Sequence, residues 1–199
     1  MRIILASKSP RRKEILQKLG IDFEVIVPDV DENVGDLAPD KTVEAISEKK
    51  AKAVLKKLAD KKDTLIIAAD TVVNIEGKIL GKPKDENDAK EMLKTLSGNT
   101  HTVLTGFTLC CNGRIFTSHE ETRVKFKELS DSEIENYVNT GEPLDKAGSY
   151  GIQGKAIVFV EGIKGDFFNA VGFPIFRICE KIKSEFGIDL VFTGGEKNV

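Results

Sequence analysis

The N-terminal stretch, residues 3–16, constrains the fold most, because it joins an apolar strand to a helix through a polar turn. Residues 3–6 read Ile-Ile-Leu-Ala, which predicts a short buried strand. Ser9 is suited to cap the following helix, and Pro10 suits its first position, where a missing N–H costs nothing. Gly20 then provides a stop signal. A strand, turn and helix in this order are typical of proteins that mix helices with a sheet.

The turn itself carries positive charge where a helix start disfavours it. Arg11 and Arg12 lie in the first helical turn, at the positive end of the helix dipole. A bound anion would resolve this conflict. Free backbone N–H groups, the hydroxyls of Ser7 and Ser9 and both guanidinium groups would then point at one phosphate. The alternative is a solvated basic helix end without a ligand.

Length and composition limit the classes of protein to consider. The 199 residues suffice for one domain with a full core, which we place over 1–199. A net charge of −2 gives no global positive field that would recruit nucleic acid, so a polyanion site must be local. Three cysteines without metal-ligand spacing indicate a reducing compartment. We find no signal peptide and no membrane-spanning stretch, so we expect a soluble, cytoplasmic protein.

Apolar patterns and turn signals predict the remaining elements. Strands are expected over 23–27, 65–68, 102–111, 114–126 and 156–160, a turn over 76–77, a turn and strand over 162–172, and helices over 42–58, 87–96, 130–137 and 174–186. Asn112-Gly113 is a strong hairpin signal, Asp85 is the expected cap of the helix over 87–96, and Ser130 with Glu133 forms a capping box. Because strands and helices do not strictly alternate, we expect an α/β fold with a mixed, twisted sheet flanked by helices. The tail from Gly194 to Val199 is expected to be loose.

Carboxylates follow two of the predicted strands. Asp70 comes after the apolar run 65–68, and open α/β sheets bind ligands at their strand ends. Asp29, Asp31 and Glu32 follow the preceding strand, so the acids would cluster if the two strands are neighbours. Clustered carboxylates without histidine or cysteine suit Mg²⁺ or Mn²⁺. The alternatives are a turn or capping role for Asp70 and an exposed acidic turn for the other three.

Two lysines are candidates for phosphate binding. Lys82 lies between Gly81 and Pro83, a setting that restricts its backbone. Lys50 is one of several lysines on its predicted helix, and its alternative is a solvated position. Cations that face a carboxylate–metal cluster are typical of phosphoryl chemistry, because they neutralise phosphate oxygens while a carboxylate positions or deprotonates water.

The stretch 150–154, Tyr-Gly-Ile-Gln-Gly, is a candidate for binding a flat base, since glycines allow close backbone approach. Gln153 offers one acceptor and two donors, which match the N3–H and carbonyl oxygens of uracil or thymine, and Thr71 would add a hydroxyl. The alternative is a structural turn. His101 and His119 have no paired ligand at helical spacing, and we interpret them as ordinary strand or surface residues.

Together these motifs resemble the Maf family of nucleoside triphosphate pyrophosphatases, in order and over nearly the whole chain. The matching pieces are Ala6 to Arg12, Asp31-Glu32, Lys50-Ala51, Ala69 to Val73, Gly81 to Pro83, Ser97-Gly98, Glu142 to Gly148, Tyr150 to Gly154 and Asn169 to Pro174. The resemblance implies an elongated fold of two lobes around a central cleft, related to inosine triphosphate pyrophosphatases. It also implies metal-dependent hydrolysis of a nucleoside triphosphate to the monophosphate and pyrophosphate.

The resemblance assigns roles to individual residues. Thr71 and Gln153 are similar to the residues of the dTTP/UTP branch of the family. We therefore expect catalytic Asp70, Lys82 and Lys50, metal ligands Glu32 and Asp70, and substrate-binding Ser7, Ser9, Arg11, Arg12, Thr71 and Gln153. The expected cofactor is a divalent metal cation, Mg²⁺ or Mn²⁺. The family further suggests a homodimer.

Two other functions remain open at this point. One is a nucleotide- or nucleic-acid-binding regulator of cell division without turnover, which the basic first helix would also serve. Its weakness is the acidic cluster, which repels a polyanion unless a metal intervenes. The other is a phosphatase that releases orthophosphate, which only the reaction product would distinguish.

Overall fold

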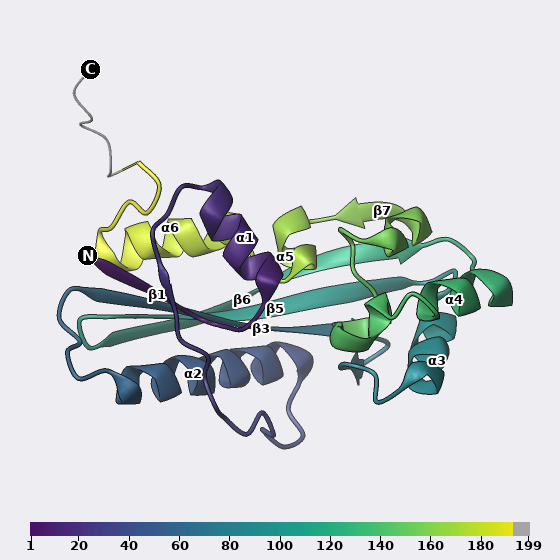
Figure 1. Cartoon of the computed structure of the whole chain (residues 1–199), viewed down its shortest axis with the longest axis horizontal. Helices are drawn as coiled ribbons and strands as arrows, with labels where there is room; N and C mark the ends of the chain where they lie inside the picture. The colour runs from purple at the N-terminus through teal and green to yellow at the C-terminus, as the bar shows by residue number, and fades with distance from the viewer. Residues whose placement is uncertain (193–199) are drawn as a thin grey trace.

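The computed structural model describes residues 1–192 as an elongated molecule built on one mixed sheet (Figure 1). The seven strands are β1 Arg2–Ala6, β2 Glu24–Val25, β3 Thr64–Ile75, β4 Lys78–Leu80, β5 Thr100–Cys111, β6 Arg114–Phe126 and β7 Val160–Lys164. The helices are α1 Pro10–Lys18, α2 Pro39–Lys57, α3 Glu86–Leu96, α4 Asp131–Val138, α5 Phe167–Val171 and α6 Ile175–Phe186, with 3₁₀ helices η1 Glu142–Asp145, η2 Ala147–Ser149 and η3 Lys155–Phe159. The expected α/β fold is confirmed. The tail from Gly194 to Val199 lies outside the described residues.

The strand order creates a gap along one edge of β3. The sheet runs β2-β1-β3-β5-β6-β7, with β4 also paired to β3. β1 is parallel to β3 and stops at Ala6, opposite Ala68. β4 joins the same edge from Val73 onward, since β5 occupies the other edge. Residues 69–72 therefore have no strand neighbour on this side within the described part of the chain. We name this edge the β3 gap.

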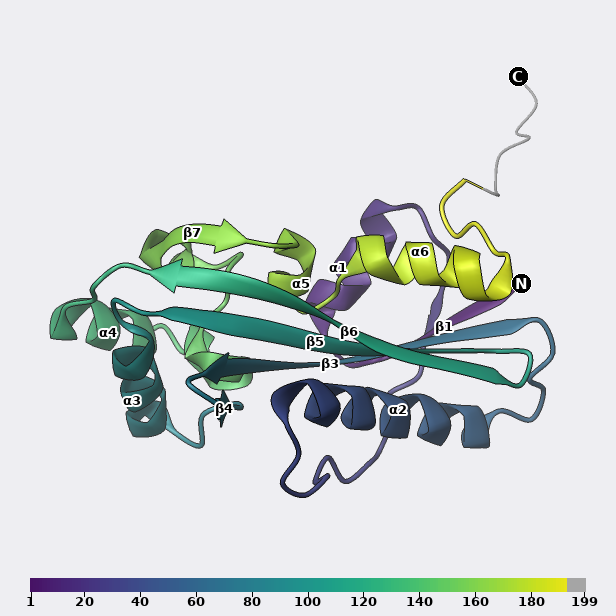
Figure 2. The same ribbon diagram turned by 180° about the vertical axis from the view of Figure 1, so that it is seen from behind.

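Helices cover both faces of the sheet, and β3 alternates between them. α2 lies along one face, while α1, α5 and α6 lie on the other (Figures 1 and 2). Ile66 and Ala68 pack in one apolar cluster with Val54 of α2. Leu65 and Ile67 belong to the main core on the opposite face. Because strand side chains alternate, Asp70 continues the α2 face and Thr71 the opposite one.

Several local signals in the sequence gave correct turns and caps. Asn112 and Gly113 have φ angles of 49° and 79° and join β5 to β6 in the expected hairpin. The Asp85 side chain accepts a hydrogen bond from the Asp88 N–H at the start of α3. Ser130 and Glu133 form the predicted capping box of α4. These signals succeed because they act over a few residues of chain.

Other predicted strands were wrong in extent or type. The run 65–68 belongs to a strand that continues to Ile75, so Asp70 lies inside a strand and not at its end. It nevertheless lies just beyond the end of β1, its parallel neighbour. The predicted strand 23–27 shortens to Glu24–Val25.

The region after Gly154 was also predicted incorrectly. Residues 155–159 form the 3₁₀ helix η3, and the stretch 162–172 contains the end of β7 and then the helix α5. Ala156 and Phe159, three residues apart, are buried, while the two residues between them are exposed. This spacing fits a 3₁₀ turn, and a short apolar run does not distinguish such a turn from a strand. Among the described residues, no helix has the length and apolar character needed to span a bilayer.

Candidate active site

Every side chain predicted to act on a ligand lines one cavity of about 840 Å³. The predicted residues found there are Ser7, Ser9, Arg11, Arg12, Glu32, Lys50, Asp70, Thr71, Lys82 and Gln153. The cavity opens at the β3 gap, where the turn after β1, the segment 27–32 and the turn 150–153 meet. Its volume lies in the range of small-molecule sites. Residues far apart in the sequence therefore form a single candidate site.

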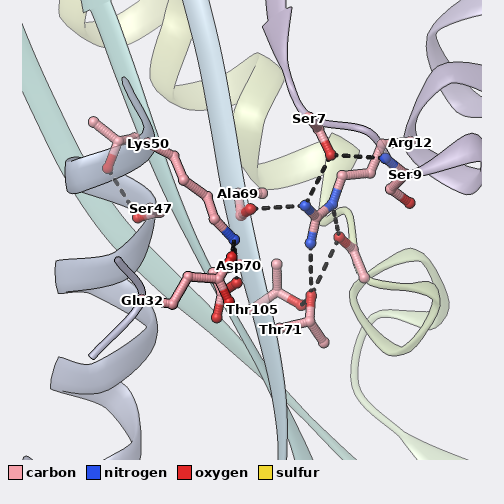
Figure 3. A network of polar contacts seen from close by, with 12 residues as sticks. Ser7, Ser9, Arg12, Glu32, Ser47, Lys50, Ala69, Asp70, Thr71 and Thr105 are labelled. Carbon is pink, nitrogen blue, oxygen red and sulfur yellow. Dashed lines mark hydrogen bonds and ion pairs between the residues drawn. The ribbon is translucent and has the colours of Figure 1, made fainter. Parts of the chain in front are cut away.

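Lys50 joins the two predicted metal ligands. Its Nζ lies 2.6 Å from Asp70 Oδ1 and 2.8 Å from Glu32 Oε1 (Figure 3). The side chains of Lys50 and Asp70 are only 11% and 13% exposed, so this pair is largely removed from water. Burial acts to raise the pKa of the Glu32 carboxyl, but the hydrogen bond and charge of Lys50, with smaller contributions from Lys82 and Lys8, lower it below its ordinary value. Lys50 thus occupies no solvated helix face.

The two carboxylates fit a divalent cation that also binds substrate. Among residues 1–192, no group of three or more His, Cys, Asp or Glu side chains gathers as a ready metal site. Asp29 lines the cavity, whereas Asp31 accepts a hydrogen bond from the Asn33 N–H, so the wider acidic cluster does not form. Mg²⁺ commonly takes one or two protein carboxylates and completes its shell with phosphate and water. Asp70 and Glu32 meet that requirement.

Arg12 points into the protein and connects three segments. Its Nε donates to Gly172 O at 2.8 Å, and its Nη1 donates to Ala69 O at 2.7 Å and to Ser7 Oγ at 3.2 Å (Figure 3). Burial lowers the pKa of the guanidinium to about 10, against the opposing effect of the Asp70 charge, so Arg12 stays charged at neutral pH. The bond to Ala69 satisfies a carbonyl inside the β3 gap.

Thr71 belongs to the same network on the face opposite α2. Its hydroxyl accepts a hydrogen bond from Arg12 Nη2 at 3.0 Å and lies 3.0 Å from the hydroxyl of Thr105. Thr105 in turn donates to Asn169 O at 3.2 Å. Asp70 and Thr71 are adjacent, yet they serve opposite faces of the sheet. Since β1 has ended, a ligand at the gap reaches both side chains around the edge of β3.

The first turn of α1 differs from the expectation in one respect. Ser9 occupies the N-cap position and Pro10 begins the helix, as predicted, but the Ser9 side chain makes no capping hydrogen bond. Instead, the Ser9 N–H donates to Ser7 Oγ at 3.1 Å. The Ser7 hydroxyl therefore links the turn to Arg12, while Arg11 lines the cavity next to it.

Some cavity residues carried no role in the sequence reasoning. Lys8 and Asp145 both line the cavity. Burial acts to raise the pKa of the Asp145 carboxyl, but Lys146, Arg11 and Lys82 lower it below its ordinary value. For Asp145, the glycine-rich character of 141–148 was the signal in the sequence that could have pointed to a cavity residue. Gly106, opposite Asp70 on β5, was a second one, because a glycine inside a strand often marks close backbone approach.

His101 is a strand residue, as expected, and it has a specific partner in the core. It lies on β5 as a strand residue but is buried, and its Nε2 lies 2.7 Å from the hydroxyl of Tyr150. Burial lowers the pKa of the imidazole to about 4, so the ring is neutral at physiological pH. His119 is partly exposed beside Glu44, as a surface residue. His101 thus anchors the first residue of the turn that carries Gln153.

Comparisons with known proteins identify the family of this chain. The family described as Maf-like protein matches residues 2–185. A protein of Thermoanaerobacter sp. (strain X514) named dTTP/UTP pyrophosphatase is 49% identical over 193 residues, covering 96% of this chain and 100% of its own. A protein of the same name from Thermosipho africanus (strain TCF52B) is 51% identical over 90% of this chain and 91% of its own. Another, from Bacillus cereus (strain G9842), is 47% identical over 95% of this chain and 97% of its own.

Among solved structures, the crystal structure of a Vibrio cholerae protein aligns with 70% of this chain and 68% of its own, at 13% identity and a TM-score of 0.33, which is too low to carry an argument. The family assignment instead rests on the match to residues 2–185 and on relatives near half identity over almost full length. The strand–turn–helix at the N-terminus and the cavity at the β3 gap both lie inside that match. This chain therefore belongs to the Maf family.

Proposed function

We propose that this protein hydrolyses dTTP and UTP to the nucleoside monophosphate and pyrophosphate, with a divalent cation as cofactor. Three relatives near half identity carry the name dTTP/UTP pyrophosphatase. The observation that carries the proposal is the placement of Asp70 and Glu32 around Lys50 in the cavity that Gln153 also lines. Acid, cation and base-binding groups thus lie where one nucleotide would contact all of them.

In the proposed reaction, Asp70 positions or deprotonates the water that attacks the α-phosphorus. Lys50 Nζ, 2.6 Å from Asp70 Oδ1, orients this carboxylate. Asp70 and Glu32 would hold Mg²⁺ or Mn²⁺, which supplies charge neutralisation at the phosphate oxygens. Lys82 and Arg11 line the same cavity and would bind the pyrophosphate as it leaves.

The turn after β1 and the two flanking networks would hold the rest of the nucleotide. Ser7, Ser9 and the first helical turn offer hydroxyl and N–H donors to phosphate. The Arg12 guanidinium is bonded to Gly172, Ser7 and Ala69, so we assign it to holding this phosphate turn together as well as to binding. Thr71 and Gln153 would read the pyrimidine, Thr71 from the strand and Gln153 as an exposed side chain of the turn 150–153.

Product analysis tests the proposal. Purified protein with Mg²⁺ or Mn²⁺ is expected to convert UTP and dTTP to monophosphate and pyrophosphate, and a chelator is expected to abolish this turnover. Asp70→Asn should reduce turnover by roughly 10²- to 10⁴-fold, since it removes a general base. Release of orthophosphate would instead identify a phosphatase. A salt-dependent affinity for RNA or DNA without turnover would favour the binding protein.

We also infer a cytoplasmic location, because the three cysteines Cys110, Cys111 and Cys179 are free thiols. Burial raises the pKa of the Cys110 and Cys179 thiols to about 11, so both stay protonated and unreactive. The homodimer suggested by the family stays a prediction, which sedimentation or light scattering of the purified protein would test.

A further inference from the structure

The turn that carries Gln153 rests on a carboxylate and a phenol to which the reaction gives no role. The hydroxyl of Tyr137, on α4, donates to Glu142 Oε1 at 3.0 Å. The same hydroxyl accepts a hydrogen bond from the Gly151 N–H at 3.2 Å. Glu142 Oε2 accepts from the Lys155 N–H at 3.1 Å. Tyr137 and Glu142, named here the clamp, therefore hold the backbone on both sides of Gln153.

Two glycines make room for the side chains beneath this turn. A Cβ placed on Gly154 would lie 1.9 Å from Glu142 Oε1 and 2.5 Å from Glu142 Cδ. A Cβ on Gly151 would lie 2.7 Å from Lys146 Cε. Gly154 has a φ of −101°, which any residue adopts, so it is the carboxylate and not the backbone angle that requires glycine there. The two glycines around Gln153 thus fit the side chains of Glu142 and Lys146.

The surroundings make the clamp rigid. Burial raises the pKa of the Tyr137 phenol above its ordinary value, so the hydroxyl keeps the proton that it donates. Lys146 Nζ donates to Glu142 O at 2.7 Å and to Asp145 Oδ1 at 2.6 Å, which fixes the segment that carries Glu142. At the start of the turn, the Tyr150 hydroxyl is bonded to the buried His101. The Gln153 side chain itself is exposed at the cavity wall.

We propose that Tyr137 and Glu142 are positioning residues that set the base preference of this enzyme. They touch neither the phosphates nor the acids of the site. They fix the backbone from which Gln153 reaches the base, so their loss weakens binding of the preferred base more than it slows the reaction. This inference rests on the proposed function, because it takes Gln153 to be the residue that reads the pyrimidine.

Gly154→Ala tests the clamp, because the new methyl group would occupy the space of the Glu142 carboxylate. The new methyl group would expel the Glu142 carboxylate from its bonds to Tyr137 and Lys155. We expect the ratio of kcat/KM for UTP to that for GTP to fall about 10- to 100-fold, mainly through the KM for UTP. Tyr137→Phe, which removes the shared hydroxyl, should lower the ratio similarly. Gly162→Ala is the matched control, since a Cβ there meets open space.

A double-mutant cycle separates the clamp from general damage to the fold. Once Glu142→Ala has removed the carboxylate, adding Gly154→Ala has nothing left to displace. Its effect on the UTP/GTP ratio should then shrink to less than about twofold. Amide hydrogen exchange at Gly151 and Lys155 provides a readout that needs no activity, and both amides should exchange faster in Tyr137→Phe and Gly154→Ala than in Gly162→Ala.

The outcomes decide between the alternatives. Faster exchange with an unchanged UTP/GTP ratio would overturn the proposal, and so would a Gly154→Ala effect of equal size with and without Glu142. Unchanged exchange would show that the clamp does not hold the turn. Wild-type protein that hydrolyses no nucleotide would refute the proposed function instead, and amide exchange would still decide whether Tyr137 and Glu142 hold the backbone.

Discussion

The ammonium group of Lys50 balances two carboxylates, the largely buried Asp70 and the exposed Glu32. It contacts Asp70 and Glu32 at 2.6 and 2.8 Å, and its side chain is 11% exposed. The neighbouring Lys49 is exposed, and its Nζ donates to the backbone carbonyls of Asp31 and Asn33. Adjacent lysines on α2 therefore have very different surroundings, which the repeated residue type in the sequence conceals.

This difference gives a matched pair of variants. Lys50→Met keeps the length of the side chain but removes the ammonium group that contacts both Asp70 and Glu32. We expect turnover of UTP to fall by roughly 10²- to 10³-fold, the usual cost of removing one charged group that stabilises a transition state. Lys49→Met should keep wild-type turnover within about twofold. Steady-state kinetics check both, and a larger loss in Lys49→Met would place the catalytic lysine one residue earlier.

His101 predicts how stability depends on pH. Burial lowers its folded pKa from 6.5 to about 4, so between these values the unfolded chain binds a proton that the folded chain does not. The contribution of the neutral His101 ring to the free energy of unfolding is therefore complete above pH 6.5 and is lost as the pH falls toward 4. The expected loss is about 3 kcal/mol in the free energy of unfolding.

Denaturant unfolding of His101→Gln from pH 7 to pH 4 checks this. The variant should be less stable than wild type at pH 7 and should show a flatter decline on acidification. His119→Gln provides the comparison for a partly exposed histidine beside Glu44. Parallel declines in wild type and His101→Gln would rule out the buried ring as the cause.

Among the elements, the position of α2 depends on Gly106 of β5, which has no side chain to keep the helix away from the strand. A Cβ on Gly106 would lie 2.3 Å from the backbone C and O of Val43, so the helix contacts the strand directly. Gly106 also pairs with Asp70 in the sheet. The close approach therefore occurs beside the acid, and it brings the helix that carries Lys50 within reach of Asp70.

Gly106→Ala should consequently disturb both stability and turnover. Backbone atoms yield less than side chains do, so we expect a loss of about 1 to 3 kcal/mol in the free energy of unfolding. We also expect a drop in kcat, as α2 and Lys50 move away from Asp70. Urea unfolding and kinetics measure the two effects. Gly162→Ala, again with open space around the new methyl group, should change neither, and equal stability in both variants would contradict the prediction.

At this scale the sequence predicted what depends on neighbouring residues. The hairpin at Asn112-Gly113 and the caps at Asp85 and Ser130 were correct, because a few adjacent residues determine them. The extent of β3 was not predicted, since its second half is held by β4 and β5, which come later in the chain. η3 was missed for a related reason, because its pattern was too short to reveal the period.

In the candidate site, too, the sequence predicted what residue types and local motifs reveal and missed what distant contacts determine. Residue type and motif order identified Asp70, Lys50 and Gln153 as site residues, and all of them line one cavity. Their partners escaped notice. That Arg12 turns inward to Ala69, and that Tyr137 supports the turn at Gly151, depends on contacts between residues distant in the chain. No spacing rule predicts such contacts from a single sequence.

For the whole molecule, the long strands connect both ends of the structure. β3, β5 and β6 run from the end covered by α2 and α6 to the end near α3 and α4 (Figure 2). The cavity lies between these ends, but the strands pass beneath it without interruption. We therefore expect the chain to unfold as one cooperative unit, as the predicted domain 1–199 requires. Calorimetry should give equal calorimetric and van't Hoff enthalpies, and two separate transitions would mean that the two ends are independent domains.

The side chains of β3 alternate between the two faces of the sheet at the β3 gap. This alternation limits where residues can be inserted or deleted in the chain during evolution. Asp70 and Thr71 face opposite sides of the sheet, so one residue inserted or deleted between Ala68 and Asp70 would exchange their faces relative to the half of β3 that pairs with β1. The acid would then meet Arg12 and Thr105, and a hydroxyl would face Lys50. The turns at 76–77 and 112–113 carry no such constraint. Changes of length are therefore expected in those turns, and the spacing across the β3 gap is expected to stay the same.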